Sequence, residues 1–135
     1  MSHADERFIE PWISEKGWNA KDFKGLETPC YVISQKHLEK NLKILAQVEK
    51  KAGVKVLAAL KAFSMWPYFP LIKKYLSGTE CSSVNEARLG ATYFGKETHI
   101  FSPAYTEENM RQYLEYANHI SFNSFSQWNR FKKWF

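Results

Sequence analysis

The sequence is poor in cysteine and contains no long hydrophobic run. Its two cysteines, Cys30 and Cys81, have no metal-type spacing and are too few for a disulfide scaffold, so we expect reduced core residues. No stretch approaches the roughly 20 apolar residues of a membrane-spanning helix, and the first residues are too polar for a secretory signal. We therefore expect a cytoplasmic protein with no membrane partner.

The composition is that of a soluble globular domain. With 44% hydrophobic and 24% charged residues, the 135-residue chain is long enough for one hydrophobic core. A net charge of +5 together with 16% aromatic residues would suit single-stranded nucleic-acid binding. The basic residues, however, are scattered in pairs such as Lys50–Lys51 and Lys73–Lys74, a pattern typical of solvated helix faces. We therefore expect no nucleic-acid partner.

Strand-like and helix-like segments alternate along the chain. The predicted strands are 30–33, 54–60, 80–82, 99–101 and 120–122. Helix-starting residues follow them at Ser34, Ser83, Thr106 and Ser124, with capping boxes predicted for Ser83–Glu86 and Ser124–Gln127. Expected helix ends are Gly53, Gly95 and Asn118, and Pro70 predicts a late or bent second helix. This serial pattern predicts parallel strands with right-handed crossovers.

Two α/β architectures fit that pattern, an open doubly wound sheet and a β/α barrel. No glycine-rich dinucleotide turn follows the first predicted strand, where residues 34–37 stand instead, so the barrel is favoured. An eight-stranded (TIM) barrel needs about 250 residues, whereas this chain supplies about five β-α units. The last residues, 131–135, have the spacing of an unfinished helix. We therefore expect a partial barrel with open sheet edges.

Lys61 stands at the end of an almost wholly apolar run, residues 54–63. One interpretation is a solvent-exposed lysine after the strand. The other is a desolvated amine whose lowered pKa allows condensation with an aldehyde or ketone. Active residues of barrels lie at the carboxyl ends of strands, which favours the second interpretation.

Several motifs together resemble the carboxynorspermidine (carboxyspermidine) decarboxylases, which are alanine-racemase-like (fold type III) pyridoxal-phosphate enzymes. The most specific are LKAFSMW at 60–66 and FSPAY at 101–105. Further matches are LETPCYV (26–32), LEKNL (38–42), GTECSS (78–83), EARLG (86–90) and HISFNS (119–124). The resemblance covers residues 26–135, and residues 1–25 would be an amino-terminal extension.

The resemblance implies a pyridoxal-phosphate barrel followed by a β-rich domain in a homodimer. Lys61 would hold the cofactor as an imine, and a carboxylated polyamine precursor would lose carbon dioxide to give norspermidine or spermidine. Glu80 and Glu86 match acidic positions near the cofactor. The phosphate-binding loop, the acid facing the pyridine nitrogen, the stacking histidine and the partner subunit's cysteine would lie beyond Phe135. The 135-residue chain alone is therefore expected to be inactive.

The local sequence leaves alternatives for these residues. The predicted helix cap at Ser83 already explains Glu86, and His119, which opens a strand, is interpreted as non-catalytic. Ser102 and Asn123 follow strand ends and could face the pocket. Rival functions are an ornithine, arginine or diaminopimelate decarboxylase, an amino-acid racemase, and a non-catalytic cofactor-binding barrel protein.

Overall fold

The computed structural model describes residues 20–135, so most of the expected extension at 1–25 lies outside the described residues. The chain divides into two units, residues 1–33 and 34–135. The described part of the first unit holds a short 3-10 helix, η1 (Ala20–Phe23), and an extended segment with a cis Thr28–Pro29 bond. The strand predicted at 30–33 is wrong, because this segment pairs with no strand in the described residues and leaves Tyr31 almost fully exposed.

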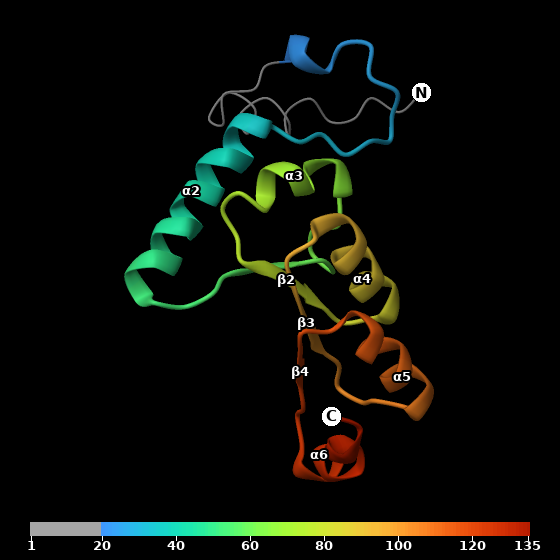
Figure 1. The fold of residues 1–135 in the computed structure, drawn as a ribbon. Coiled ribbons are helices and arrows are strands. Elements are labelled where there is room, and N and C mark those ends of the chain that lie inside the picture. Colours follow the sequence, from blue (N-terminus) through green and yellow to red (C-terminus); the bar gives the residue numbers. More distant parts are fainter. Residues whose placement is uncertain (1–19) are drawn as a thin grey trace. The chain divides into compact units, whose positions relative to one another are not determined.

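The second unit is built on a four-stranded parallel sheet. Its strands are β1 (Leu57–Ala59), β2 (Gly78–Cys81), β3 (Glu97–Phe101) and β4 (His119–Ser121), in the spatial order β1-β2-β3-β4 (Figure 1). All three pairings are parallel, which confirms the predicted α/β class. The order runs in one direction without the reversal that defines a doubly wound sheet. Four strands, not five, are present in the described residues.

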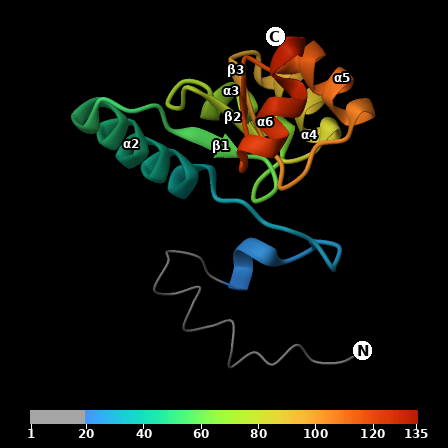
Figure 2. The ribbon, with the colours of Figure 1, turned by 90° about the horizontal axis from the view of Figure 1, so that it is seen from below.

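Helices precede the first strand, connect successive strands and follow the last one. They are α2 (Gln35–Ala52), α3 (Phe69–Ile72), α4 (Val84–Leu89), α5 (Glu107–Tyr116) and α6 (Phe125–Phe131), with the shorter η2 (Trp66–Tyr68), η3 (Gly90–Phe94, π-helical) and η4 (Lys132–Trp134). Helices α4 and α5 lie on the same side of the strands in both views (Figures 1 and 2). Within residues 20–135, no helix combines the length and the apolar character needed to cross a membrane.

The predicted helix starts are confirmed. The side-chain oxygens of Ser34, Ser83, Thr106 and Ser124 each accept a hydrogen bond from the amide three residues later. Gly53 and Gly95 end their helices with φ of 64° and 68°, in the left-handed region that glycine tolerates. Helix α3 begins late, at Phe69, so that Pro70 lies in its first turn, where proline is tolerated.

Three local predictions are wrong. Asn118 is not a left-handed helix cap, because it pairs with Thr98 through its amide N–H (2.9 Å) and its Oδ1 (2.8 Å). The capping boxes are only half formed, since Glu86 accepts from Ser82 and Gln127 from Tyr105 rather than from the capping serines. β1 is shorter than 54–60, because the amide of Val56 donates to the Glu49 carboxylate at 2.7 Å instead of to the sheet.

The two faces of the sheet differ in character. In β3, Thr98 and Ile100 are buried in the core, while the alternating residues Glu97 and His99 lie on the other face. Fully buried aromatic side chains, Phe69, Phe94 and Phe131, fill the core that the helices cover. Of the two cysteines expected in the core, Cys81 is buried and Cys30 is exposed, so that expectation is wrong for Cys30. Burial raises the pKa of the Cys81 thiol to about 11.

Glu49 connects α2 to the start of the sheet. Its carboxylate accepts the Val56 amide (2.7 Å) and the Ser77 hydroxyl (2.8 Å), and these hydrogen bonds lower the pKa of Glu49. A carboxyl group whose pKa is lower in the folded state stabilises the fold above its unfolded pKa, and this contribution is lost as the pH falls through the folded value.

We therefore expect Glu49→Gln to lower the free energy of unfolding at pH 7, with a difference from the parent chain that shrinks as the pH falls below about 4. Urea unfolding followed by circular dichroism at several pH values measures this difference. Glu27→Gln, at an exposed position outside the helices and strands, is the matched carboxamide control. A destabilisation by Glu49→Gln that stays constant from neutral to acid pH would contradict the assignment.

Candidate active site

A lysine, a serine and a carboxylate meet at the carboxyl ends of β1 and β2. Lys61 Nζ donates a hydrogen bond to Ser82 Oγ at 3.2 Å and lies 3.8 Å from Glu80 Oε2. Ser82 Oγ in turn donates to Glu80 Oε1 at 3.4 Å. Two of the residues predicted from the sequence, Lys61 and Glu80, are thus brought together, and Ser82 joins them.

Strand pairing explains this meeting. Ala59 is the register partner of Glu80, and the Leu60 amide donates to the Glu80 carbonyl at 3.0 Å. Immediately afterwards the chain turns, because the amides of Ala62 and Phe63 both donate to the Ala59 carbonyl at 3.1 Å. Lys61 therefore projects from the tip of a turn at the carboxyl edge of the sheet.

The predicted burial of Lys61 is wrong for this chain. Its side chain is 59% exposed, whereas that of Glu80 is 23% exposed. Side chains of a strand alternate between faces, so the neighbouring Leu60 enters the core and is 2% exposed, while Lys61 lies on the side of Glu80. Desolvation of this amine therefore requires groups that residues 20–135 do not supply.

Ser82 is held in place from two sides. Glu86 Oε2 accepts the Ser82 amide N–H at 2.8 Å, and the Tyr113 hydroxyl donates to the Ser82 carbonyl at 3.4 Å. Glu86 thus fixes the turn between β2 and α4, and its predicted contact with a cofactor stays a prediction. The sequence signal for Ser82 was its place two residues after Glu80, on the same face of the strand.

A second group of loop residues follows β3 and β4. The Tyr105 hydroxyl accepts from the Ser102 amide (2.9 Å) and donates to the Ser121 carbonyl (2.8 Å). Asn123 Nδ2 donates to the Pro103 carbonyl at 2.8 Å. Burial raises the pKa of Tyr105, which keeps its phenol protonated as a donor. Ser102 and Asn123 therefore join loops to one another, and their predicted place in a substrate pocket stays a prediction.

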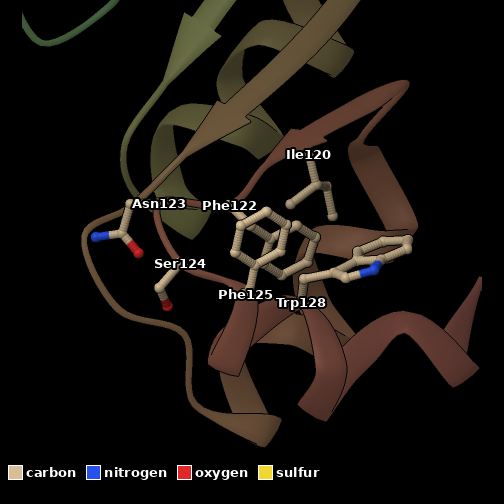
Figure 3. Close-up of a pocket in the computed structure, with 6 residues that line it drawn as sticks. All are labelled: Ile120, Phe122, Asn123, Ser124, Phe125 and Trp128. Atoms are coloured by element: carbon tan, nitrogen blue, oxygen red, sulfur yellow. The ribbon is translucent and has the colours of Figure 1, made fainter.

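A pocket also lies between β4 and α6. In Figure 3 the rings of Phe122, Phe125 and Trp128 gather on one side and the polar side chains of Asn123 and Ser124 on the other. Phe125 is 86% exposed. The pocket is largely aromatic and carries no ionisable side chain among its lining residues, so Lys61 and its neighbours are the stronger candidate for covalent chemistry.

Comparisons with known proteins find that the chain is similar to decarboxylases. No family model matches the chain. A carboxyaminopropylagmatine decarboxylase from a Synechocystis species is 39% identical over 108 residues, which are 80% of this chain and 28% of the relative. Carboxynorspermidine/carboxyspermidine decarboxylases from Herminiimonas arsenicoxydans and Campylobacter jejuni are 41% and 36% identical over 106 and 110 residues.

A solved structure agrees with these relatives. The crystal structure of carboxynorspermidine decarboxylase from Campylobacter jejuni, complexed with norspermidine, superposes with a TM-score of 0.76 at 37% identity over 80% of this chain. The resemblance to carboxynorspermidine and carboxyspermidine decarboxylases inferred from the sequence is thereby confirmed. The chain spans less than a third of the length of these relatives, 28% to 29%.

Proposed function

We propose that the natural protein containing this chain is a pyridoxal-phosphate-dependent decarboxylase of carboxynorspermidine or carboxyspermidine, and that it forms norspermidine or spermidine. The observation that carries the proposal is the placement of the Lys61 amine beside Ser82 and Glu80 at the carboxyl edge of a parallel sheet. The names of the relatives, at 36% to 41% identity, supply the reaction class and the type of substrate.

The sheet supports a place within a barrel. Its four parallel strands follow one another in sequence order, and β1 and β4 are left as edges among the described residues. An open edge strand presents a row of unpaired backbone N–H and C=O groups, and strands of further β-α units would pair with them. We therefore propose that residues 26–135 form the amino-terminal part of a β/α barrel. The resemblance implies, in addition, a β-rich domain and a homodimer.

The three clustered side chains suit a lysine that must act as a nucleophile. Pyridoxal phosphate, when bound, would supply an aldehyde for the amine and a ring that delocalises the electron pair left on the α-carbon when carbon dioxide departs. An amine attacks only in its neutral form. The hydrogen bonds from Lys61 to Ser82 and from Ser82 to Glu80 give the ammonium a route for its proton to the Glu80 carboxylate. Glu80 and Ser82 also orient the amine before it reacts.

The same residues fit only the aldehyde end of the cofactor. The exposed Lys61 amine is accessible to an aldehyde, but the Glu80 carboxylate beside it would repel a phosphate group. Phosphate binding therefore needs donors outside this cluster. The resemblance implies that the phosphate-binding loop and the groups contacting the ring belong to segments beyond Phe135, and we propose that the chain alone is catalytically incomplete.

The first prediction from this proposed function concerns the natural protein that contains this sequence. Lys61→Ala is expected to lower carbon dioxide release from carboxynorspermidine by at least about a hundredfold, because general acid–base assistance alone contributes about 10²–10⁴-fold. Carbon dioxide release is measured with carboxynorspermidine, carboxyspermidine, ornithine, arginine and diaminopimelate. Lys36→Ala, on the exposed start of α2, is the matched control and should keep parental activity.

Each rival function has its own outcome in this assay. Preference for ornithine, arginine or diaminopimelate would replace the proposed substrate, and interconversion of amino-acid enantiomers without carbon dioxide release would indicate a racemase. Cofactor binding without turnover of any substrate would indicate a carrier. Undiminished decarboxylation by Lys61→Ala would overturn the role of Lys61.

The second prediction concerns the 135-residue chain alone. Mixed with pyridoxal phosphate and reduced with borohydride, it should give substoichiometric labelling of Lys61 by peptide mass spectrometry, and no carbon dioxide release from carboxynorspermidine. The physical reason is that Lys61 is exposed and that the Glu80 carboxylate, 3.8 Å from its amine, would repel the phosphate group. A stoichiometric adduct on Lys61 accompanied by carbon dioxide release would show that the chain is sufficient by itself.

A further inference from the structure

A second cluster of ionisable side chains lies on the sheet face that carries Glu80. Glu97 and His99 are alternate residues of β3, so they point to the same face, and His119 is the register partner of His99 on the neighbouring strand β4. Side chains at such directly paired positions are close neighbours across strands. Strand register thus assembles two imidazoles and one carboxylate from residues up to 22 positions apart in the sequence.

The three side chains of the cluster lie close together. His99 Nε2 lies 3.0 Å from Glu97 Oε2, and His119 Nε2 lies 3.8 Å from the same oxygen. The two imidazole rings are stacked, with centroids 4.3 Å apart and planes inclined by 28°. One possible ligand atom from each of the three residues lies within 4.8 Å of the others.

Lys55 holds the carboxylate in this orientation. Its ammonium bonds Glu97 Oε1, which leaves Oε2 directed at both imidazoles. The side chains of Glu97, His99 and His119 are 33%, 24% and 56% exposed, so a cation can reach them from solvent. A partner that fixes a ligating carboxylate from behind is typical of metal sites.

The donor atoms determine which cation fits. Two neutral imidazole nitrogens and one carboxylate oxygen are ligands of Zn²⁺, which bonds them at about 2.0–2.2 Å. Tetrahedral geometry then requires donor atoms roughly 3.3 Å apart, and two of the three separations in the cluster, 3.0 and 3.8 Å, are already close to that value. Because the two imidazole planes are stacked, their ring-plane lone pairs do not meet at one point, and metal binding requires a rotation of the exposed His119 ring. Hard cations such as Mg²⁺ prefer oxygen ligands and fit this set poorly.

We propose that Glu97, His99 and His119 form a binding site for Zn²⁺ or a related borderline divalent metal, with Lys55 as a positioning residue and, in the 135-residue chain, the fourth coordination position open to solvent. This site is distinct from Lys61 and Ser82, because Glu97 and His119 open their strands whereas Lys61 and Ser82 follow theirs. The proposal does not rest on the decarboxylation proposed above.

The test uses the 135-residue chain purified without a histidine tag. Co²⁺ serves as the probe, since a tetrahedral site with nitrogen ligands gives intense visible absorption, and Zn²⁺ is then added to displace it. We expect one Co²⁺ per chain, displaced by one Zn²⁺. His119→Gln and His99→Gln should each weaken Zn²⁺ binding by at least about tenfold, since loss even of a second-shell partner costs 10–100-fold.

Two controls make the result decisive. His37→Gln, on α2, should bind Zn²⁺ as the parent chain does, and circular dichroism should show that His119→Gln keeps the parental fold, since that side chain is more than half exposed. No Co²⁺ or Zn²⁺ binding by the folded parent chain would overturn the proposal. So would binding that survives both cluster substitutions or is weakened as much by His37→Gln.

Discussion

The parallel pairing of β1 with β2 is the constraint on which the candidate active site depends. A lysine after one strand and an acidic residue in the next are 19 positions apart in the sequence, and only the register Ala59–Glu80 makes them neighbours. The backbone hydrogen bond from Leu60 to Glu80 extends this pairing by one residue to the base of the turn. A shift of one residue in the pairing register of β2 would point the Glu80 side chain into the core and away from Lys61.

Because side chains alternate along each strand, the two faces of the sheet carry different kinds of residue. One face carries Leu60, Cys81 and Ile100 into the core that the helices complete. The other carries the ionisable residues, including Glu80, Glu97 and His99, which the core could not accept without partners. The buried face of these short strands therefore stabilises the fold, and the opposite face carries the residues of the candidate active site. In a complete barrel, further strands would enclose the face that bears Lys61.

The parts of the fold that the sequence predicted well are those determined locally. The hydroxyl caps at Ser34, Ser83, Thr106 and Ser124 and the glycine ends at Gly53 and Gly95 depend on residues within one turn of helix, so their patterns were sufficient. Residues 30–33 have strand-like composition but no pairing partner in the described chain, and pairing is a long-range property. Asn118 likewise forms a long-range hydrogen bond with Thr98 and does not adopt the helix-cap conformation that its residue type favours locally.

In the candidate site, too, local features were predictable from the sequence and long-range ones were not. The position of Lys61 at a strand end was predictable from the apolar run before it, but its exposure was not, because burial depends on which other segments cover the turn. The meeting of Ser82 with Lys61 and the pairing of His99 with His119 required the strand register, which no local pattern encodes.

The most direct test of the central claim is zero-length cross-linking of the 135-residue chain with a carbodiimide, followed by peptide mass spectrometry. The carboxylate of Glu80 and the amine of Lys61 lie 3.8 Å apart, so an amide joining them is expected, along with the internal controls Lys43–Glu39 and Lys55–Glu97. Formation of both control cross-links without any Lys61–Glu80 product, or cross-linking of Lys61 to Glu97 in its place, would contradict the account.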